Sequence, residues 1–332
     1  MSNHLPASHH HLSLWFALKS LLVCQLVLGA TGIVWAQPGA NRRATTLADL
    51  SGMTWVGGDY FVAVHDAKAV DERSLPRVAT LQIPRGPKGV LYRDSRIVIK
   101  GQVPNDLESV AGIPGRQEFL LVESGDGSGD TLVPKIYKAK LRPGGVRVTK
   151  VKPWPVAINN VEGTAVAKVG DDYFFLFAER ADNQESTQLC WVLFDPQKLK
   201  FLGEVQSVTF AQPDPARFNR VIVGLDVDSQ GLIYSVSAFD PENADPPITA
   251  NPDNGPFAAG VYVIGAIHGE SGHAEIELLP TPSLLGMVDG CKVESVAIKE
   301  DTNAGTFEIF IGTDDENYGG VIRPLPPPVI NR

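Results

Sequence analysis

Short apolar runs recur along the chain, and most of them are bounded by Gly, Pro or Asp. Five times, an apolar run that begins at a polar or acidic residue is followed, after a turn, by a second and more strongly apolar run. The second runs are Tyr60–Val64, Phe119–Val122, Tyr173–Phe177, Leu232–Val236 and Phe307–Ile311. Runs of this length that are rich in β-branched and aromatic residues predict β-strands.

The strand pairs form a repeat, because their starts lie 54 to 70 residues apart. A period of this size indicates blades or a solenoid, and the lack of a 3.6-residue periodicity excludes a helical solenoid. The first four units continue with two more strand-like runs, which in the first unit are Arg77–Ile83 and Ile97–Lys100. We therefore predict an all-β fold, a five-bladed β-propeller, with a sixth blade left open by the long stretch 240–290.

The last unit is short, because only Gly320–Arg323 follows its strand pair. We expect its missing outer strand to come from residues 42–47, near the start of the domain. Such a strand closes the ring and removes the free edges that an open ring would expose.

An apolar stretch near the N-terminus ends in the small-residue pattern Val34-Trp35-Ala36, which predicts a cleaved signal peptide at residues 1–36. The alternative is an uncleaved membrane anchor, but an apolar core of about 15 residues is short for a span, which needs about 20. We expect a secreted or periplasmic protein whose residues 37–332 form a single propeller domain with no membrane span after cleavage. Cys190 and Cys291 would remain, in different units, and their pairing stays open.

Composition narrows the class of partner. With 43% hydrophobic and 20% charged residues, the chain can bury a core. Its net charge of -9 provides no basic face of the kind that nucleic-acid binding requires. We expect a monomer that acts on or binds a small molecule, and no nucleic acid.

In a propeller, the starts of the innermost strands meet around the central channel. The residues at these positions, here called the inner set, are Ser51, Glu108, Glu162, Gly224 and Glu294. Three carboxylates around one axis repel each other, so a cation would stabilise their ionised forms. Oxygen ligands suit calcium, to which Ser51 would add a hydroxyl and Gly224 a carbonyl. The sequence thus predicts a central calcium site; the alternative is that each glutamate bonds to nearby backbone or faces water.

An acidic residue also ends the second strand of every unit, before the long loops. These residues, here called the outer set, are Asp66, Glu123, Glu179, Asp240 and Asp314, the last followed by Asp315. Long polar loops on one face often carry function, although Asp and Glu also favour turns for local reasons. The basic residues expected on this face are His65, Lys68, Arg73 and Arg180. Asp66 or Glu179 would act as a base toward water, and Arg180 would bind an anionic group.

The segment Asp106-Leu107-Glu108-Ser109-Val110-Ala111 and its counterpart from Val161 to Ala165 resemble the repeat units of secreted phytase-like propellers, the "esterase-like activity of phytase" family. The resemblance covers most of residues 45–325. The inner set is also similar to that of the calcium-dependent apyrases, five-bladed propellers with one Ser or Glu per blade around a calcium ion, from which Gly224 departs. The apyrase resemblance implies a catalytic role for Asp66, but Ala67 and Lys68 stand where an Arg would follow.

Two functions follow from these patterns. The first is a secreted, calcium-binding propeller that hydrolyses a phosphoric ester, phytase-like or nucleotidase-like, with Asp66, Glu179 and Arg180 at the catalytic site. The alternative is a non-catalytic propeller that binds a ligand or a protein and holds a structural calcium. We expect a face rich in acids and poor in bases, and both functions stay open.

Overall fold

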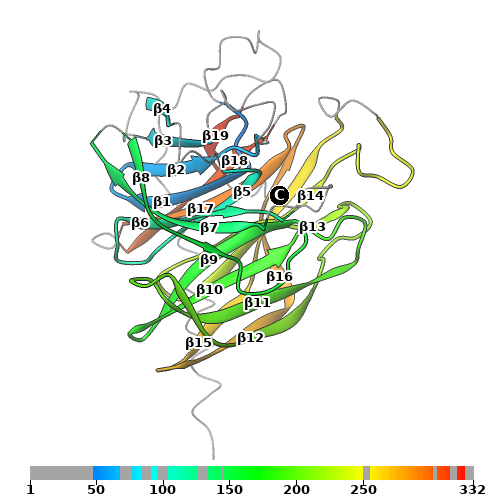
Figure 1. The fold of residues 1–332 in the computed structure, drawn as a ribbon. Helices are drawn as coiled ribbons and strands as arrows, with labels where there is room; N and C mark the ends of the chain where they lie inside the picture. The colour runs from blue at the N-terminus through cyan, green and yellow to red at the C-terminus, as the bar shows by residue number, and fades with distance from the viewer. Residues whose placement is uncertain are drawn as a thin grey trace, which may run out of the picture.

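The computed structural model describes residues 48–67, 77–83, 91–95, 104–125, 133–143, 145–249, 255–301, 305–314 and 320–325. These residues form nineteen strands in five antiparallel sheets and contain no helix (Figure 1). Within them there is accordingly no helix long and apolar enough to cross a membrane. The predicted signal peptide, 1–36, and the predicted closing strand, 42–47, lie outside the described residues.

Each sheet is built from consecutive strands of the chain. The first blade contains β1 (Gly52–Gly57), β2 (Tyr60–Val64), β3 (Val78–Gln82) and β4 (Leu91–Ser95). The second contains β5 (Leu107–Gly112), β6 (Glu118–Glu123), β7 (Lys135–Arg142) and β8 (Gly145–Pro153). The third contains β9 (Val161–Val169), β10 (Asp172–Glu179), β11 (Ser186–Asp195) and β12 (Lys200–Ala211). The fourth contains β13 (Arg220–Val227), β14 (Leu232–Phe239), β15 (Ala258–Glu270) and β16 (His273–Asp289), and the described part of the fifth contains β17 (Val293–Asp301), β18 (Thr306–Thr313) and β19 (Ile322–Pro324).

The first strands of the five sheets form the inside of a closed ring. The strands β1, β5, β9, β13 and β17 contact one another in that order, and β17 contacts β1 (Figure 1). The fold is therefore a five-bladed β-propeller, as the repeat predicts. The stretch 240–290 adds no sixth blade, since it forms the unusually long hairpin of β15 and β16 in the fourth. Near the start of the domain, the backbone N–H of Leu50 donates to the carbonyl of Thr313 at the end of β18, 3.0 Å away.

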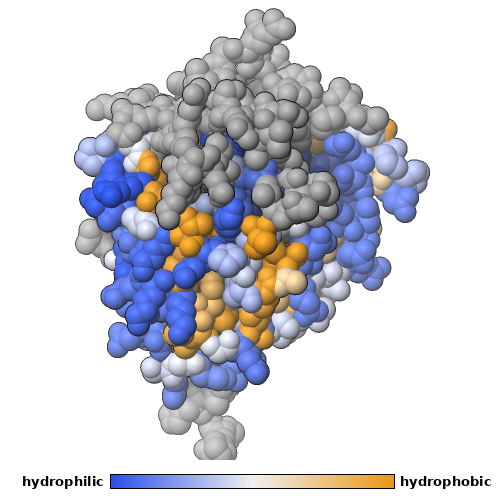
Figure 2. Space-filling model, viewed as in Figure 1, coloured by the Kyte–Doolittle hydropathy of each residue, from blue (hydrophilic) through white to orange (hydrophobic). Residues whose placement is uncertain are grey.

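The core consists of apolar layers between neighbouring blades. Inner strands are covered on both faces, so β9 is buried at eight of its nine residues, whereas the outer strand β12 is mostly accessible. Burial of each large apolar side chain stabilises such a fold by about 1.5–3 kcal/mol. This difference explains why the first two strands of each blade give the apolar runs of the repeat, whereas the outer strands give a weaker signal. Some apolar side chains also reach the surface, as orange patches between hydrophilic areas in Figure 2 show.

The structure locates the outer strand of the first blade and gives the state of the two cysteines. The outer strand of the first blade is Leu91–Ser95, earlier in the chain than the predicted Ile97–Lys100, which lies outside the described residues. Apolar residues occur in both segments, so composition could not locate this strand. Cys190 and Cys291 are both free thiols.

Candidate functional site

The three glutamates of the inner set occupy the same local structure. Glu108, Glu162 and Glu294 are each the second residue of an inner strand. Each lies between two residues that pair with consecutive residues of the next strand, so each is the extra residue of a β-bulge. A bulged residue leaves the ladder and its side chain is re-aimed. This repeated bulge takes all three glutamates out of the regular pairing of their strands, and Glu162 and Glu294 line the central cavity.

Two of these bulges are preceded by a residue whose backbone has a left-handed conformation, with a positive φ angle. Asp106 and Asn160, two positions before Glu108 and Glu162, have φ angles of 55° and 50°. Asp and Asn are the non-glycine residues that tolerate this conformation best. The hydroxyl of Ser124 donates a short hydrogen bond to the carboxylate of Asp106, which fixes this turn.

Three residues of the inner set line a narrow central cavity. Glu162, Gly224 and Glu294 line it, together with residues from the start of β1 and β5, so all five blades contribute. Its volume is only about 10 Å³, which is room for one water molecule. A substrate therefore cannot pass between the inner strands and would meet the carboxylates at the end of the channel.

The glycine in the inner set has a steric reason. A Cβ atom at Gly224 would lie 3.0 Å from the carbonyl oxygen of Glu294 and 3.2 Å from the Cα of Ser295. The strands β13 and β17 approach each other too closely at this point for a side chain. The register also places Gly224 directly after the bulge of β13, as it places Ser109, Gly163 and Ser295 in their blades, so Gly224 lies one position beyond the place of the glutamates.

A cationic side chain neutralises part of the negative charge of the inner set in the third blade. The guanidinium of Arg180, directly after β10, donates to the carboxylate of Glu162 at 2.6 Å and to that of Asp182 at 2.7 and 2.9 Å. Burial raises the pKa of Glu162 to about 7; the charge of Arg180 opposes this rise, and the charge of Glu294 adds to it. Glu162 therefore changes its ionisation near neutral pH.

Two buried cations, Arg220 and Lys292, neutralise the carboxylates around Glu294. Arg220, only 4% exposed, contacts the carboxylates of Glu294 at 2.6 Å and Asp240 at 2.7 Å. The ammonium of Lys292 lies 3.4 Å from Glu294, 3.8 Å from Asp240 and 3.6 Å from Asp314. Burial raises the pKa of Glu294, and Lys292 opposes the rise. The expectation of a face poor in bases is wrong, because the buried Arg220 and Lys292 and the partly buried Arg180 lie beside the inner set.

Glu108 differs from the other two glutamates. Among the described residues, no hydrogen bond or ion pair reaches its carboxylate. Its pKa is raised well above the ordinary value, first by burial and then by the negative charges of Asp66 and Asp106, with smaller contributions from Glu162 and Glu294. Protonation relieves this repulsion, so Glu108 holds a proton at a pH where an ordinary glutamate is ionised.

The outer set divides into three kinds of residue. Asp240 and Asp314 join the cation network described above. Glu123 is a structural residue, since its carboxylate accepts from the backbone of Asn105 and Lys135 and from the hydroxyl of Tyr137. The carboxylate of Glu179 accepts from the backbone N–H of Asn159 at 2.8 Å, which ties it to the preceding loop. Asp66 follows β2 and acts electrostatically on Glu108.

The predicted basic residues are placed as follows. Arg180 reaches the inner set through Glu162. His65 is buried, with its Nδ1 2.5 Å from the backbone oxygen of Asp49. Lys68, Arg73 and Asp315 lie outside the described residues. Arg220 and Lys292 were not predicted, although each directly begins or precedes an inner strand, which is the position that marks the inner set itself.

Calcium binding remains a prediction, and the residues fit a cation on one side of the channel only. Within the described residues, the hydroxyl of Ser51 and one carboxylate oxygen of Glu162 are buried without a partner, and no cation pairs with Glu108. Glu294, on the other side, already has Arg220 and Lys292. Across the described part of the chain, no group of three or more His, Cys, Asp or Glu side chains is arranged to hold a metal ion.

No protein-family model matches the chain, and no curated protein is similar to it in sequence. Its fold is similar to that of an endo-arabinase from Bacteroides thetaiotaomicron, with a TM-score of 0.51 and 11% identity over 85% of this chain and 95% of the other. It is also similar to a thermostable family-43 glycoside hydrolase, with a TM-score of 0.51 and 11% identity over 84% of this chain and 88% of the other. At this identity the similarity establishes the propeller fold alone.

The assignment to phytase-like or apyrase-like families is wrong. The two similar solved structures named above are an endo-arabinase and a family-43 glycoside hydrolase, not a phytase or an apyrase. The quoted motif is short, and it describes a strand start with a glutamate in a bulge, which is a local backbone feature rather than the signature of one chemistry.

Proposed function

We propose that this protein is a hydrolase that cleaves a glycosidic bond, with Glu108 and Glu162 as its acid–base pair. The observation that carries the proposal is the carboxyl group of Glu108, whose pKa is raised well above its ordinary value beside a second glutamate with a pKa of about 7. Glycosidic bonds are commonly hydrolysed by two carboxyl groups, one protonated and one ionised.

The two groups have environments that separate their roles. Glu108 lies near other acids and pairs with no cation of the described ranges, so it keeps its proton and would donate it to the leaving oxygen. Glu162 is bonded to Arg180, which favours its ionised form, so it would accept a proton from the attacking water. Pairs of titratable groups with different environments often mark such acid and base roles.

Two further observations support a carbohydrate substrate. The negative charges of Asp66 and Asp106 near Glu108 would repel a phosphate ester, whereas a neutral, hydroxyl-rich ligand is not repelled and can donate hydrogen bonds to carboxylates. The two similar structures quoted above are an arabinase and a family-43 glycoside hydrolase, so the same fold supports this chemistry elsewhere. Asp66 remains a proposed neighbour of the acid, because its charge raises the pKa of Glu108.

The test uses the chain from residue 37 to 332 on linear arabinan, xylan, and aryl arabinofuranosides and xylosides. We expect sugar release, with Glu108→Gln and Glu162→Gln each lowering kcat/KM by about 10²–10⁴-fold. Glu204→Gln, on the exposed outer strand β12, is the matched control and should keep full activity. No release by folded protein, or full activity in Glu108→Gln, would refute the proposal.

A binding propeller with a structural calcium is the second candidate. It is favoured by the unpartnered oxygens of Ser51 and Glu162 next to the uncompensated Glu108. We expect added calcium to raise the Tm of metal-stripped wild type, and to leave the Tm of Glu108→Gln unchanged. A calcium-independent Tm would contradict this candidate, and calcium stabilisation without any hydrolysis would favour it over the enzyme.

A further inference from the structure

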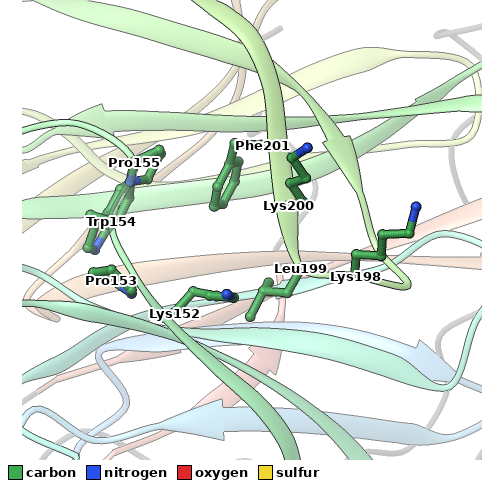
Figure 3. Close-up of a pocket in the computed structure, with 8 residues that line it drawn as sticks. All are labelled: Lys152, Pro153, Trp154, Pro155, Lys198, Leu199, Lys200 and Phe201. Atoms are coloured by element: carbon green, nitrogen blue, oxygen red, sulfur yellow. The ribbon is translucent and has the colours of Figure 1, made fainter.

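A second hollow lies on the side of the propeller, between the second and third blades. It is formed by residues 152–155, at the end of β8, and residues 198–201, in the hairpin between β11 and β12 (Figure 3). Its volume of about 510 Å³ is within the range of small-molecule sites. None of the inner or outer set lines it, so it is separate from the channel. We call it the side groove.

One wall of the side groove is held in place by lysines from the other blade. The ammonium groups of Lys138 and Lys150 donate to the backbone oxygens of Pro196 and Gln197, at 2.9 and 2.8 Å. The carboxylate of Asp195 accepts from two backbone N–H groups within the same hairpin, at 2.8 and 3.0 Å. The hairpin is therefore fixed against the second blade before any ligand binds, which lowers the entropy cost of binding.

The floor of the side groove is aromatic. The Trp154 ring packs against Phe177 with centroids 5.2 Å apart, and Phe201 packs against Phe175 and Phe194 at 5.5 and 5.4 Å. The indole N–H of Trp154 already donates to the backbone oxygen of Glu123. These rings thus offer an apolar surface and no free directional donor.

The rim of the side groove is basic, although the whole chain carries a net charge of -9. Lys152, Lys198 and Lys200 contribute exposed side chains. In Figure 3, Lys152 extends across the hollow toward the second segment, and Lys198 and Lys200 extend outward from its edge. Asp195 lies 3.6 Å from Lys198, but its carboxylate also caps the hairpin. Compact ammonium charges above an apolar floor complement an anion that carries a ring.

We propose that the side groove binds a small organic anion that combines a flat apolar ring with a carboxylate or sulfonate group. The ring would lie against Phe201 and the accessible edge of Trp154, which is 8% exposed, and the anionic group would face Lys152, with Lys198 and Lys200 adding positive charge at the edge. This site is independent of the proposed glycosidase activity, since it shares no residue with the channel.

The test measures binding of 2-naphthoate and of the neutral 2-naphthalenemethanol by calorimetry to the chain from residue 37 to 332. We expect naphthoate to bind with a Kd of about 0.1–1 mM and to weaken with added salt, and the neutral alcohol to bind at least about tenfold more weakly. The triple variant Lys152→Gln, Lys198→Gln, Lys200→Gln should lose about tenfold or more in affinity, and Phe201→Ala should also weaken binding.

Lys168→Gln is the matched control, because it removes one exposed lysine elsewhere on the third blade and should leave the Kd unchanged. The side groove is not an anion site if naphthoate fails to bind folded wild type up to about 10 mM. The same conclusion follows if the neutral alcohol binds equally well, or if the triple variant keeps the wild-type Kd. If the triple variant loses naphthoate binding and keeps the hydrolytic activity of wild type, the side groove and the channel are separate sites.

Discussion

Replacing Arg220 by methionine tests whether ion pairs hold the channel together. The guanidinium is 4% exposed and lies within 2.7 Å of both Glu294 and Asp240. Methionine fills much of the same space without a charge. The change therefore leaves two buried carboxylates with Lys292 as their nearest cation, at 3.4 and 3.8 Å.

The expected loss follows from the cost of a buried charge without its partner. Removing one member of a buried ion pair lowers the free energy of unfolding by about 3–5 kcal/mol. For a domain of this size, 1 kcal/mol corresponds to roughly 2–4 °C, so we expect the Tm to fall by roughly 6–20 °C. Loss of the cation also raises the pKa of Glu294 further, so the deficit relative to wild type should be largest near pH 8 and shrink as the pH falls and the carboxylate is protonated.

The assay is denaturant and thermal unfolding followed by circular dichroism at several pH values. Arg217→Met is the control, since Arg217 is 43% exposed and its partner Asp289 69% exposed, and exposed pairs contribute about 0–1 kcal/mol. The reasoning is refuted if both variants lose the same stability, or if the deficit of Arg220→Met is the same at pH 5 and pH 8. A deficit that does not depend on pH would reflect packing rather than charge.

Three further predictions concern the channel. Glu108→Gln should raise the Tm by a few degrees at pH 8 and by less at pH 5, because the ionised form of this carboxylate is disfavoured in the folded protein; an unchanged or lower Tm at pH 8, by calorimetry, would contradict this. For the proposed hydrolysis, kcat/KM should rise with pH through about 7 as Glu162 ionises, and Arg180→Met should move this limb to higher pH; the pH–rate profile tests both. Gly224→Ala should lower stability by about 1–3 kcal/mol in urea unfolding, because its methyl group would lie 3.0 Å from the carbonyl of Glu294, and a neutral effect would mean that the strands move apart easily.

The fold was predictable from sequence because each blade repeats one physical pattern. A strand buried on both faces must be apolar throughout, and five such pairs at similar spacing leave few alternatives. The outer strands were less predictable, as the position of β4 shows. They face solvent on one side, so their sequences carry a weaker apolar signal and their bounds depend on pairing with the neighbouring strand.

Of the candidate site, the sequence predicts the glutamates but not the cations that pair with Glu294. The glutamates Glu108, Glu162 and Glu294 recur at the same position of the repeat, and this regularity is visible in the sequence. Their cations are not repeated: Arg220 of the fourth blade reaches Glu294 of the fifth, and Lys292 of the fifth blade reaches Asp240 of the fourth. Contacts of this kind depend on closure of the ring and on the bulges, neither of which a residue pattern specifies. The sequence therefore predicts the acids and not their neutralisation.

The uneven pairing of charge around the channel locates its chemistry. Glu162 and Glu294 each have a guanidinium within 2.6 Å, whereas Glu108 has no partner in the described part of the chain. A glutamine would fill the same space at Glu108 without the repulsion from Asp66 and Asp106, so the carboxyl group lowers stability without an evident structural return. Such a loss is typical of groups that act on a ligand. A ligand that interacts with Glu108 should recover this free energy, and therefore should raise the Tm of wild type more than that of Glu108→Gln.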